Sequence, residues 1–229
     1  LQVGPDGNCE MQLLSWQAEG EKSTADISWR GERLRLELPQ PGFHNLQNAA
    51  MAVAAAITAG VEPSEAVATI ASFPGVARRM EVVGEASGVT VVDDFAHHPT
   101  ALGVTIAAAR QRWPDRRLVI AFEPRSLTAA RRSFQDAYVE SLAAADLVMV
   151  APPYHRDRLE ASETLDRKAL AAALDERGVP SVMPGDDEDL VERLLEVLRP
   201  GDVVVGCSSG AFDAMHRKLI EALQTGEDG

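Results

Sequence analysis

The sequence has few of the features that mark secreted, membrane-spanning or nucleic-acid-binding proteins. Its 229 residues include only two cysteines, Cys9 and Cys207, which lie far apart and predict neither a disulfide framework nor a paired metal site. The longest apolar run, residues 49–59, is alanine-rich and shorter than the ~18 residues of a membrane helix. Acidic residues outnumber basic residues by 35 to 22, and the net charge of −13 argues against nucleic acid or an anionic membrane as a partner. We therefore expect a cytoplasmic protein.

The chain also lacks a common nucleotide-binding motif. No glycine is followed by lysine, so the Gly-x-x-x-x-Gly-Lys-Ser/Thr loop that cradles phosphates is absent. The first residue is leucine rather than methionine, and no basic, apolar leader opens the sequence. We expect the sequence to be part of a longer protein.

The residues that are present have the composition and pattern of a globular α/β protein. Hydrophobic residues make up 45% and charged residues 25%. A β-rich segment and two helices come first, and we place a domain boundary at about residue 77. Beyond it, short apolar strands alternate with helices, which predicts βαβ units in an open, mostly parallel sheet. The predicted strands are 11–17, 25–30, 34–38, 80–83, 89–92, 118–122, 147–151, 179–183 and 203–206. The predicted helices are 44–59, a short helix after Pro63 with Ser64 as N-cap, 100–112, 129–143, 166–177, 187–198 and 211–223.

Ligands of such sheets collect at the carboxyl ends of the strands, and the densest polar cluster of the chain follows one of them. Residues 93–100 read Asp-Asp-Phe-Ala-His-His-Pro-Thr. Two carboxylates and two imidazoles could bind a metal or a ribose, or act as acid and base. The plainer interpretation is that this segment ends a strand and caps the next helix.

Four further segments carry polar groups, and each has a structural alternative. Arg78 and Arg79 could clamp an anion or could be solvated surface arginines. Residues 123–128 and 207–210 follow predicted strands and could bind an anion through backbone amides, or could simply cap helices. Asn45 and Asn48 share a helix face and could contact a heterocyclic base, or one could serve as an N-cap.

Three motifs in series resemble the Mur ligase family of ATP-dependent, amide-forming enzymes of peptidoglycan synthesis. They are Pro-Gly-Phe-His-Asn-Leu-Gln-Asn-Ala-Ala at 41–50, Phe-Pro-Gly-Val-Ala-Arg-Arg-Met-Glu at 73–81, and the acidic and histidine-rich segment at 93–100. The resemblance runs from about residue 41 to residue 229. It implies that residues 1–77 are the last part of a central ATPase domain and that residues 78–229 form a C-terminal Rossmann-like domain. The N-terminal domain and the rest of the central domain would lie upstream.

The resemblance also implies a reaction. ATP would convert the muramoyl carboxylate to an acyl phosphate, and an amine would then attack the acyl phosphate. Mg²⁺ would assist the reaction, with most of its ligands upstream of this sequence. This chain alone should therefore be inactive. Residues 95–96, 123–128 and 208–213 are similar to those of members that add L-Ala-γ-D-Glu-meso-diaminopimelate to UDP-N-acetylmuramate during peptidoglycan recycling. Members that add L-alanine are the alternative.

The family's site residues carry over onto matching positions. The resemblance implies that Asn45 and Asn48 face the adenine of ATP, that Asp94 contacts its ribose and that Arg79 contacts its phosphates. It places His97 near the nucleotide or the reaction centre. Arg79 and His97 are therefore the catalytic candidates. The incoming peptide is assigned to Arg125, Ser126, Ser209 and Gly210. We expect no metal site made by this chain alone.

Two readings from other classes remain open. One is a non-catalytic module that binds peptide or nucleotide. The other is a metal-dependent hydrolase using Asp93, Asp94, His97 and His98, with His155 or Asp186 as a further ligand. If residues 1–77 are part of a larger domain, they should also expose apolar surface where the rest of it docks.

Overall fold

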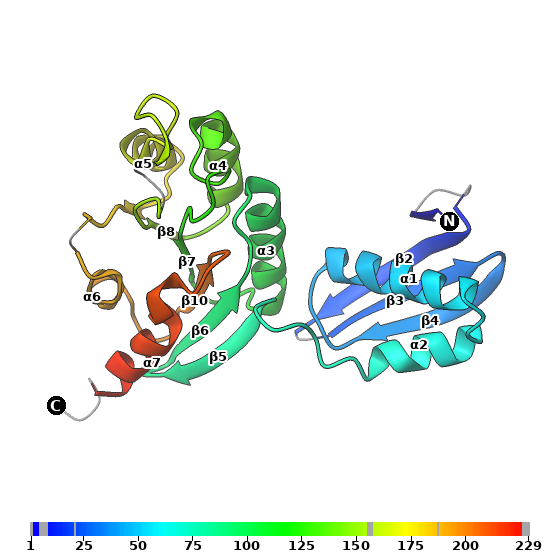
Figure 1. The fold of residues 1–229 in the computed structure, drawn as a ribbon. Helices are drawn as coiled ribbons and strands as arrows, with labels where there is room; N and C mark the ends of the chain where they lie inside the picture. The colour runs from blue at the N-terminus through cyan, green and yellow to red at the C-terminus, as the bar shows by residue number, and fades with distance from the viewer. Residues whose placement is uncertain (1, 5–8, 21, 155–157, 187, 226–229) are drawn as a thin grey trace. The chain divides into compact units, whose positions relative to one another are not determined.

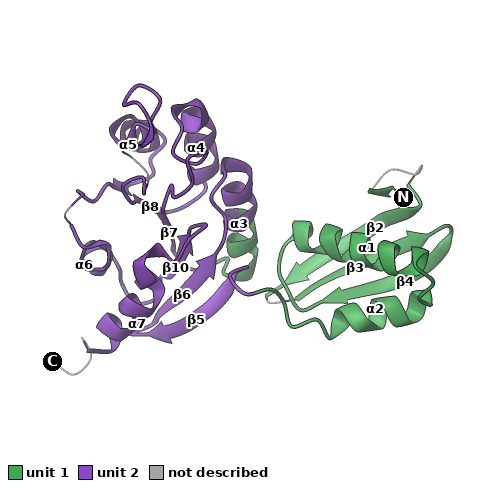
Figure 2. Cartoon of the chain, in the orientation of Figure 1, with its two compact units in different colours: residues 1–76, 107–114 green, residues 77–106, 115–229 purple. Residues whose placement is uncertain are grey.

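The computed structural model describes residues 2–4, 9–20, 22–154, 158–186 and 188–225 (Figure 1). The chain divides into two compact units (Figure 2). The first unit comprises residues 1–76 and 107–114, and the second comprises residues 77–106 and 115–229. Within the described ranges, no helix is both long enough and apolar enough to cross a membrane.

The first unit is a four-stranded sheet with two helices on one face. Strands β2, β3 and β4 form an antiparallel meander, which confirms the predicted β structure, and the short β1 pairs parallel to β2. Side chains that alternate along the strands, such as Ala25 and Ile27, are fully buried against Leu46 and Ala50 of the first helix. The elements are β1 (Val3–Gly4), β2 (Met11–Glu19), β3 (Lys22–Trp29), β4 (Glu32–Leu38), α1 (Phe43–Thr58) and α2 (Pro63–Ala71).

Two details of the first unit differ from the sequence predictions. Strand β1 was not predicted, because two residues carry no periodicity. Helix α2 begins at Pro63, and its N-cap is Glu62 rather than the predicted Ser64. Proline favours the first helical turn because its fixed φ suits the helix and its missing N–H has no partner to lose there.

The second unit is built on a six-stranded sheet in the order β5-β6-β10-β7-β8-β9. The five strands from β6 to β9 in that order run parallel, and β5 pairs antiparallel with β6 at one edge. This confirms the predicted open, mostly parallel sheet. The elements are β5 (Glu81–Ala86), β6 (Val89–Asp94), α3 (Pro99–Arg112), β7 (Leu118–Phe122), η1 (Arg132–Phe134), α4 (Gln135–Leu142), β8 (Leu147–Val150), α5 (Arg167–Glu176), β9 (Ser181–Val182), α6 (Leu190–Leu195), β10 (Val203–Cys207), η3 (Phe212–Ala214) and α7 (Met215–Thr225).

Helices cover both faces of this sheet (Figure 1). Along β7, Val119 and Ala121 belong to a buried cluster with side chains of α6 and α7. Phe122 points to the other face, where its ring lies 5.0 Å from that of Tyr138 on α4. Because every strand of a parallel sheet is buried on both faces, these strands are continuously apolar, which is why β7, β8 and β10 were readily predicted.

The strand predicted over residues 80–83 is longer in the structure, and Gly84 lies inside β5. The turn is at Ser87 and Gly88, and the register of β5 against β6 shifts between Val82 and Gly84. A Cβ at position 84 would lie 3.2 Å from Cδ1 of Ile220, so the glycine lets α7 approach the strand closely.

Three predicted helices are shorter in the structure. Helix α4 begins at Gln135 rather than 129, and α6 spans only Leu190–Leu195. Helix α7 begins at Met215 because the three residues before it have φ angles of 47°, 49° and 55°, in the left-handed region that non-glycine residues rarely adopt. A sequence pattern cannot reveal such a turn, since Phe212, Asp213 and Ala214 carry no glycine signal.

Candidate active site

The candidate site lies at the carboxyl ends of three neighbouring strands of the second unit. Asp94 at the end of β6 pairs with Cys207 of β10, and Cys207 pairs with Phe122 of β7. The three strands therefore end at the same level, and the segments that follow them lie side by side. The sequence predicted functional groups in each of these segments.

Arg78 connects the start of the second unit to two of these segments. Its Nε donates to Asp93 Oδ2 at 3.1 Å, and its Nη2 donates to the carbonyl oxygens of Ser208 at 2.7 Å and Gly210 at 2.6 Å. Its guanidinium carbon also lies 5.2 Å from the ring centre of Phe95. Arg78 is thus held by several partners, unlike its neighbour Arg79.

Arg79 and His97, the two predicted catalytic residues, both lie against the ring of Phe95. The guanidinium carbon of Arg79 is 5.7 Å from the centre of that ring, and the His97 ring meets it edge-on at 5.4 Å. Arg79 is exposed, and its side chain makes no hydrogen bond or ion pair within the described ranges. His97 Nδ1 lies 2.9 Å from the Phe95 carbonyl oxygen, which leaves Nε2 as the outward nitrogen. These two side chains are therefore available to a ligand.

Asp94, the residue assigned to the ribose of ATP, is buried within the second unit. It is 2% exposed, and its carboxylate accepts hydrogen bonds from the Met80 amide at 2.9 Å, the Ala96 amide at 2.8 Å and the Thr105 hydroxyl at 3.0 Å. These bonds hold the loop after β6 against the residues before β5 and the first turns of α3. The geometry favours a structural role, and contact with a ribose stays a prediction.

Two of the four residues assigned to the peptide, Arg125 and Gly210, are in direct contact. A Cβ at position 210 would lie 2.0 Å from Cδ and Nε of Arg125, so only glycine leaves room for this side chain. The Arg125 guanidinium carbon lies 3.8 Å from the ring centre of Tyr154, and Nη1 lies 3.5 Å from Oε1 of Glu123. Arg125 is a half-buried cation held over an aromatic ring.

The two assigned serines have different roles. Ser126 Oγ accepts a hydrogen bond from the Ala129 amide at 3.0 Å and so stabilises the turn after β7. Ser209 is half-buried beside the fully buried Ser208, whose hydroxyl donates to Glu123 and accepts from the Gly210 amide at 2.9 Å. The Glu123–Ser208 bond joins the segments after β7 and β10, and sequence reasoning did not single it out.

His216 is another residue that sequence reasoning missed. It is 7% exposed, and its Nε2 lies 3.6 Å from Asp93 Oδ1 and 3.3 Å from the Gly206 carbonyl oxygen. Burial lowers the pKa of His216, and the neighbouring Asp93 carboxylate opposes that shift. The available signal was Gly206, because a Cβ there would lie 2.1 Å from His216 Nε2, and glycine inside a buried strand often marks such an approach.

Cys207 is not a reactive thiol. It is fully buried, and burial together with the Asp94 and Asp93 carboxylates raises its pKa. A neutral thiol is a poor nucleophile, so the residue is part of the core.

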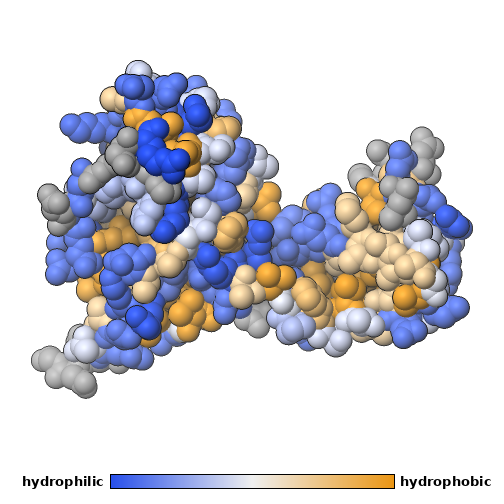
Figure 3. All heavy atoms as spheres, in the orientation of Figure 1, coloured by the Kyte–Doolittle hydropathy of each residue, from blue (hydrophilic) through white to orange (hydrophobic). Residues whose placement is uncertain are grey.

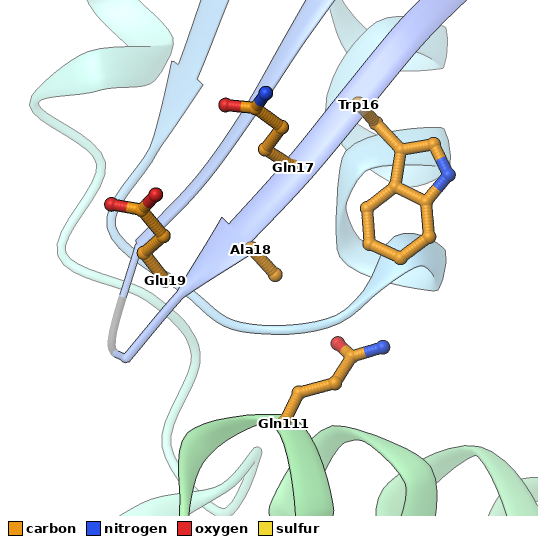
Figure 4. Close-up of a pocket in the computed structure, with 5 residues that line it drawn as sticks. All are labelled: Trp16, Gln17, Ala18, Glu19 and Gln111. Atoms are coloured by element: carbon orange, nitrogen blue, oxygen red, sulfur yellow. The ribbon is translucent and has the colours of Figure 1, made fainter.

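The residues predicted to face adenine lie in the first unit. Asn45 Nδ2 donates to the Pro41 carbonyl oxygen at 2.7 Å, whereas Asn48, one turn further along α1, is exposed. A pocket of about 360 Å³ in the same unit is lined by other residues, which Figure 4 labels: Trp16, Gln17, Ala18, Glu19 and Gln111. Neither asparagine contributes to that pocket.

The described ranges contain no group of three or more His, Cys, Asp or Glu side chains that could hold a metal ion. Asp93 is paired with Arg78, and the His98 ring packs edge-on against Phe134 at 4.8 Å, away from the His97 contacts. His155, one of the further ligands considered for a hydrolase, lies outside the described ranges. The geometry gives a metal-dependent hydrolase no support within the residues that can be described.

Comparison with known proteins decides the family. The model for "Mur ligase, glutamate ligase domain" matches residues 78–210, which is more than half of the chain and includes Arg78, Asp93, Arg125 and Gly210. The chain belongs to the Mur ligase family. This confirms the resemblance that the three sequence motifs indicated.

Individual relatives within the Mur ligase family differ in acceptor. The UDP-N-acetylmuramate–L-alanine ligase of Chloroflexus aggregans is 36% identical over 233 residues, covering 95% of this chain and 48% of the relative. The UDP-N-acetylmuramate–L-alanyl-γ-D-glutamyl-meso-2,6-diaminoheptandioate ligase of Escherichia coli is 37% identical over 215 residues, covering 91% and 44%. The crystal structure of a murein peptide ligase from Psychrobacter arcticus superposes with a TM-score of 0.68 at 29% identity, covering 97% of this chain and 46% of that one. The chain spans about half the length of the curated relatives it matches.

Proposed function

We propose that this chain is the C-terminal half of an ATP-dependent ligase that joins L-Ala-γ-D-Glu-meso-diaminopimelate to UDP-N-acetylmuramate. The observation that carries the proposal is the placement of Arg125 against Tyr154 and Gly210, where the segments after β7 and β10 meet. The tripeptide has several carboxylates along its length, whereas L-alanine has one beside its reacting amine. A guanidinium held in a fixed orientation suits a distal carboxylate, because it can bind both oxygens at once.

The nucleotide assignment follows from the side chains that are available. When bound, ATP supplies the phosphoryl group that activates the muramoyl carboxylate. Arg79 is exposed and can neutralise negative charge that develops on the transferring group, and the exposed Asn48 carboxamide can donate and accept hydrogen bonds. Each of these two residues, taken within its own unit, has the chemistry that a part of ATP requires. The described residues do not supply a Mg²⁺ site, and we place its ligands, like the phosphate loop, in the missing part of the protein.

The remaining steps use the same edge of the sheet. Arg125 orients the tripeptide so that its alanine amine can reach the activated carboxylate, which converts an encounter of two molecules into an intramolecular one. His97, which like Arg79 contacts the Phe95 ring, can accept a proton from the attacking amine at Nε2. This chain alone lacks the phosphate loop and should not turn over ATP.

The first unit fits the proposal as part of a larger central domain. Several of its large apolar side chains are exposed, including Met51 at 55%, Phe73 at 38% and Val76 at 58%. Apolar colour covers much of the face that the unit presents in Figure 3. Exposed apolar surface of this kind is explained if the upstream segment of the central domain packs on it.

L-Alanine is the second candidate acceptor, because the Chloroflexus aggregans relative that uses it is as similar to this chain as the tripeptide-adding relative. The full-length protein supplied with ATP, Mg²⁺, UDP-N-acetylmuramate and either acceptor distinguishes the two by the mass of the product. Tripeptide addition supports the proposal, and addition of L-alanine alone contradicts it.

The Gly210→Ala variant tests the acceptor site itself. The new methyl group would overlap the Arg125 side chain and displace it from Tyr154, and the fold should tolerate this because the overlap is with a half-buried side chain and not with backbone. We expect the KM for the tripeptide to rise about tenfold or more, as for the loss of a charge-assisted contact of 1.5–3 kcal/mol. The KM for UDP-N-acetylmuramate should not change. Gly185→Ala, at a glycine that like Gly210 lies outside the left-handed region and whose Cβ would meet only ordinary contacts, 3.5 Å from Glu188, is the control for backbone effects. Equal changes in both KM values would contradict the acceptor role.

A further inference from the structure

Arg78 and Arg79 both contact the Phe95 ring, but only the Arg78 side chain also makes hydrogen bonds within the described ranges. Its guanidinium reaches two segments that are far apart in the sequence: Asp93 at the end of β6, and the Ser208 and Gly210 carbonyl groups after β10. Asp93 in turn contacts His216 on α7. One side chain therefore joins the first residues of the second unit to the loops at the carboxyl edge of its sheet.

The backbone of Arg78 is fixed as firmly as its side chain. The amide donates to Glu81 Oε2 at 2.7 Å, and the carbonyl oxygen accepts from the Phe95 amide at 2.9 Å. The residue has a φ of 60°, and Met80 has a φ of 52°, both in the left-handed region. Non-glycine residues rarely adopt this conformation, so the surrounding contacts must hold the turn.

We propose that Arg78 is a positioning residue that sets the geometry of two binding elements at once. It fixes the turn that carries Arg79, and it fixes the Gly210 backbone on which Arg125 rests. The inference rests on the proposed function, in which Arg79 serves the nucleotide and Arg125 serves the acceptor. Through Arg78, a displacement of one element is transmitted to the other, so the nucleotide and acceptor sites are linked by a single guanidinium.

Arginine is required for this role, because lysine cannot reproduce the contacts. Nε and Nη2 of a planar guanidinium point in fixed, different directions, one to the carboxylate and the other to the two carbonyl groups. An ammonium group could keep the ion pair with Asp93 but could not bridge to both carbonyl oxygens. Arg78→Lys therefore removes the hydrogen bonds to the two carbonyl groups while it keeps the positive charge.

The chain offers a matched control in Arg116. Its guanidinium also joins several segments, donating to Gly201 O at 2.8 Å, Asp202 O at 2.8 Å and Thr90 Oγ1 at 2.8 Å. These partners lie at the amino ends of β6 and β10, the edge of the sheet opposite to Arg78. Arg116→Lys should destabilise the unit in a similar way without disturbing the carboxyl edge.

The test compares Arg78→Lys and Arg116→Lys in the full-length protein by kinetics and by amide hydrogen exchange. For Arg78→Lys we expect kcat to fall on the order of 10- to 100-fold, as for a misplacement of reacting groups. The KM for the acceptor should rise several-fold while the KM for UDP-N-acetylmuramate stays unchanged, and the Phe95 and Gly210 amides should exchange faster. For Arg116→Lys, faster exchange should be confined to the Thr90 and Val203 amides, with kinetic constants as in the unmodified protein.

Two failures can be told apart. If the unmodified protein forms no amide product, the proposed function is overturned. If it is active but the two variants have the same kinetic constants, or if Arg78→Lys raises all KM values equally, the proposed function stands and the positioning role of Arg78 is overturned.

Discussion

Replacing Arg79 with alanine should lower the kcat of the full-length protein by about 10²- to 10³-fold, the size of effect seen when one preorganised donor to developing charge is removed. Arg79 is exposed and, within the described ranges, makes no hydrogen bond or ion pair, so the fold does not depend on it. An exposed arginine that lies over the Phe95 ring can meet an anion without giving up a hydrogen bond to another described residue. The measurement is the steady-state rate of amide formation together with the thermal unfolding midpoint, which should be unchanged.

Arg79→Lys and Arg217→Ala complete this experiment. Arg79→Lys keeps the charge and should retain part of the activity, because a point charge lacks the paired geometry of guanidinium. Arg217, whose side chain is 75% exposed on α7 and lies 3.7 Å from Glu221, is a surface arginine with no proposed ligand, so Arg217→Ala should behave like the unmodified protein. If Arg79→Ala kept full activity, the phosphate role assigned to this residue would be wrong.

Asp94→Asn should have the largest effect on stability. The carboxylate accepts from two amides and one hydroxyl, and an asparagine would turn its NH₂ group toward at least one of these donors. Leaving buried donors unsatisfied should reduce the free energy of unfolding by about 3 kcal/mol, measured by urea denaturation. Thr105→Val removes only the hydroxyl donor and should cost about 1 kcal/mol.

The same variant decides between the two roles considered for Asp94. A structural role predicts a large loss of stability, with activity reduced through the loop after β6. A ribose contact predicts that the stability is unchanged and that only the KM for ATP rises. The second result would support the ribose assignment made from the sequence and would indicate that the loop opens around bound nucleotide.

Most strands of the second unit could be predicted because their burial leaves a pattern in the sequence. A strand buried on both faces is continuously apolar, so β7, β8 and β10 were found within a residue of their true bounds. The helix starts were less visible. The short 3₁₀ segment before α4 and the left-handed turn before α7 depend on tertiary contacts, and no residue type in them signals the change.

The candidate site was predicted as a set of segments but not as a set of contacts. Which strand lies between β6 and β7 cannot be read from the sequence, and it is this position of β10 that brings Gly210 to Arg125. The resemblance gave Asp94 a ligand role, whereas its three internal donors became evident only when Met80, Ala96 and Thr105 were placed around it. Arg78 was noticed only as half of an arginine pair, because its partners lie up to 132 positions away.

The most direct test of the central claim is a competition between the two acceptors in one vessel. The full-length protein is given ATP, Mg²⁺, UDP-N-acetylmuramate and equal concentrations of L-Ala-γ-D-Glu-meso-diaminopimelate and L-alanine, and both products are quantified by mass. The product ratio equals the ratio of the two kcat/KM values. We predict that the tripeptide product exceeds the alanine product by about 10²-fold or more, since the distal carboxylates are recognised only in the tripeptide. A predominance of the alanine product would contradict the account and assign the protein to the L-alanine-adding members of its family.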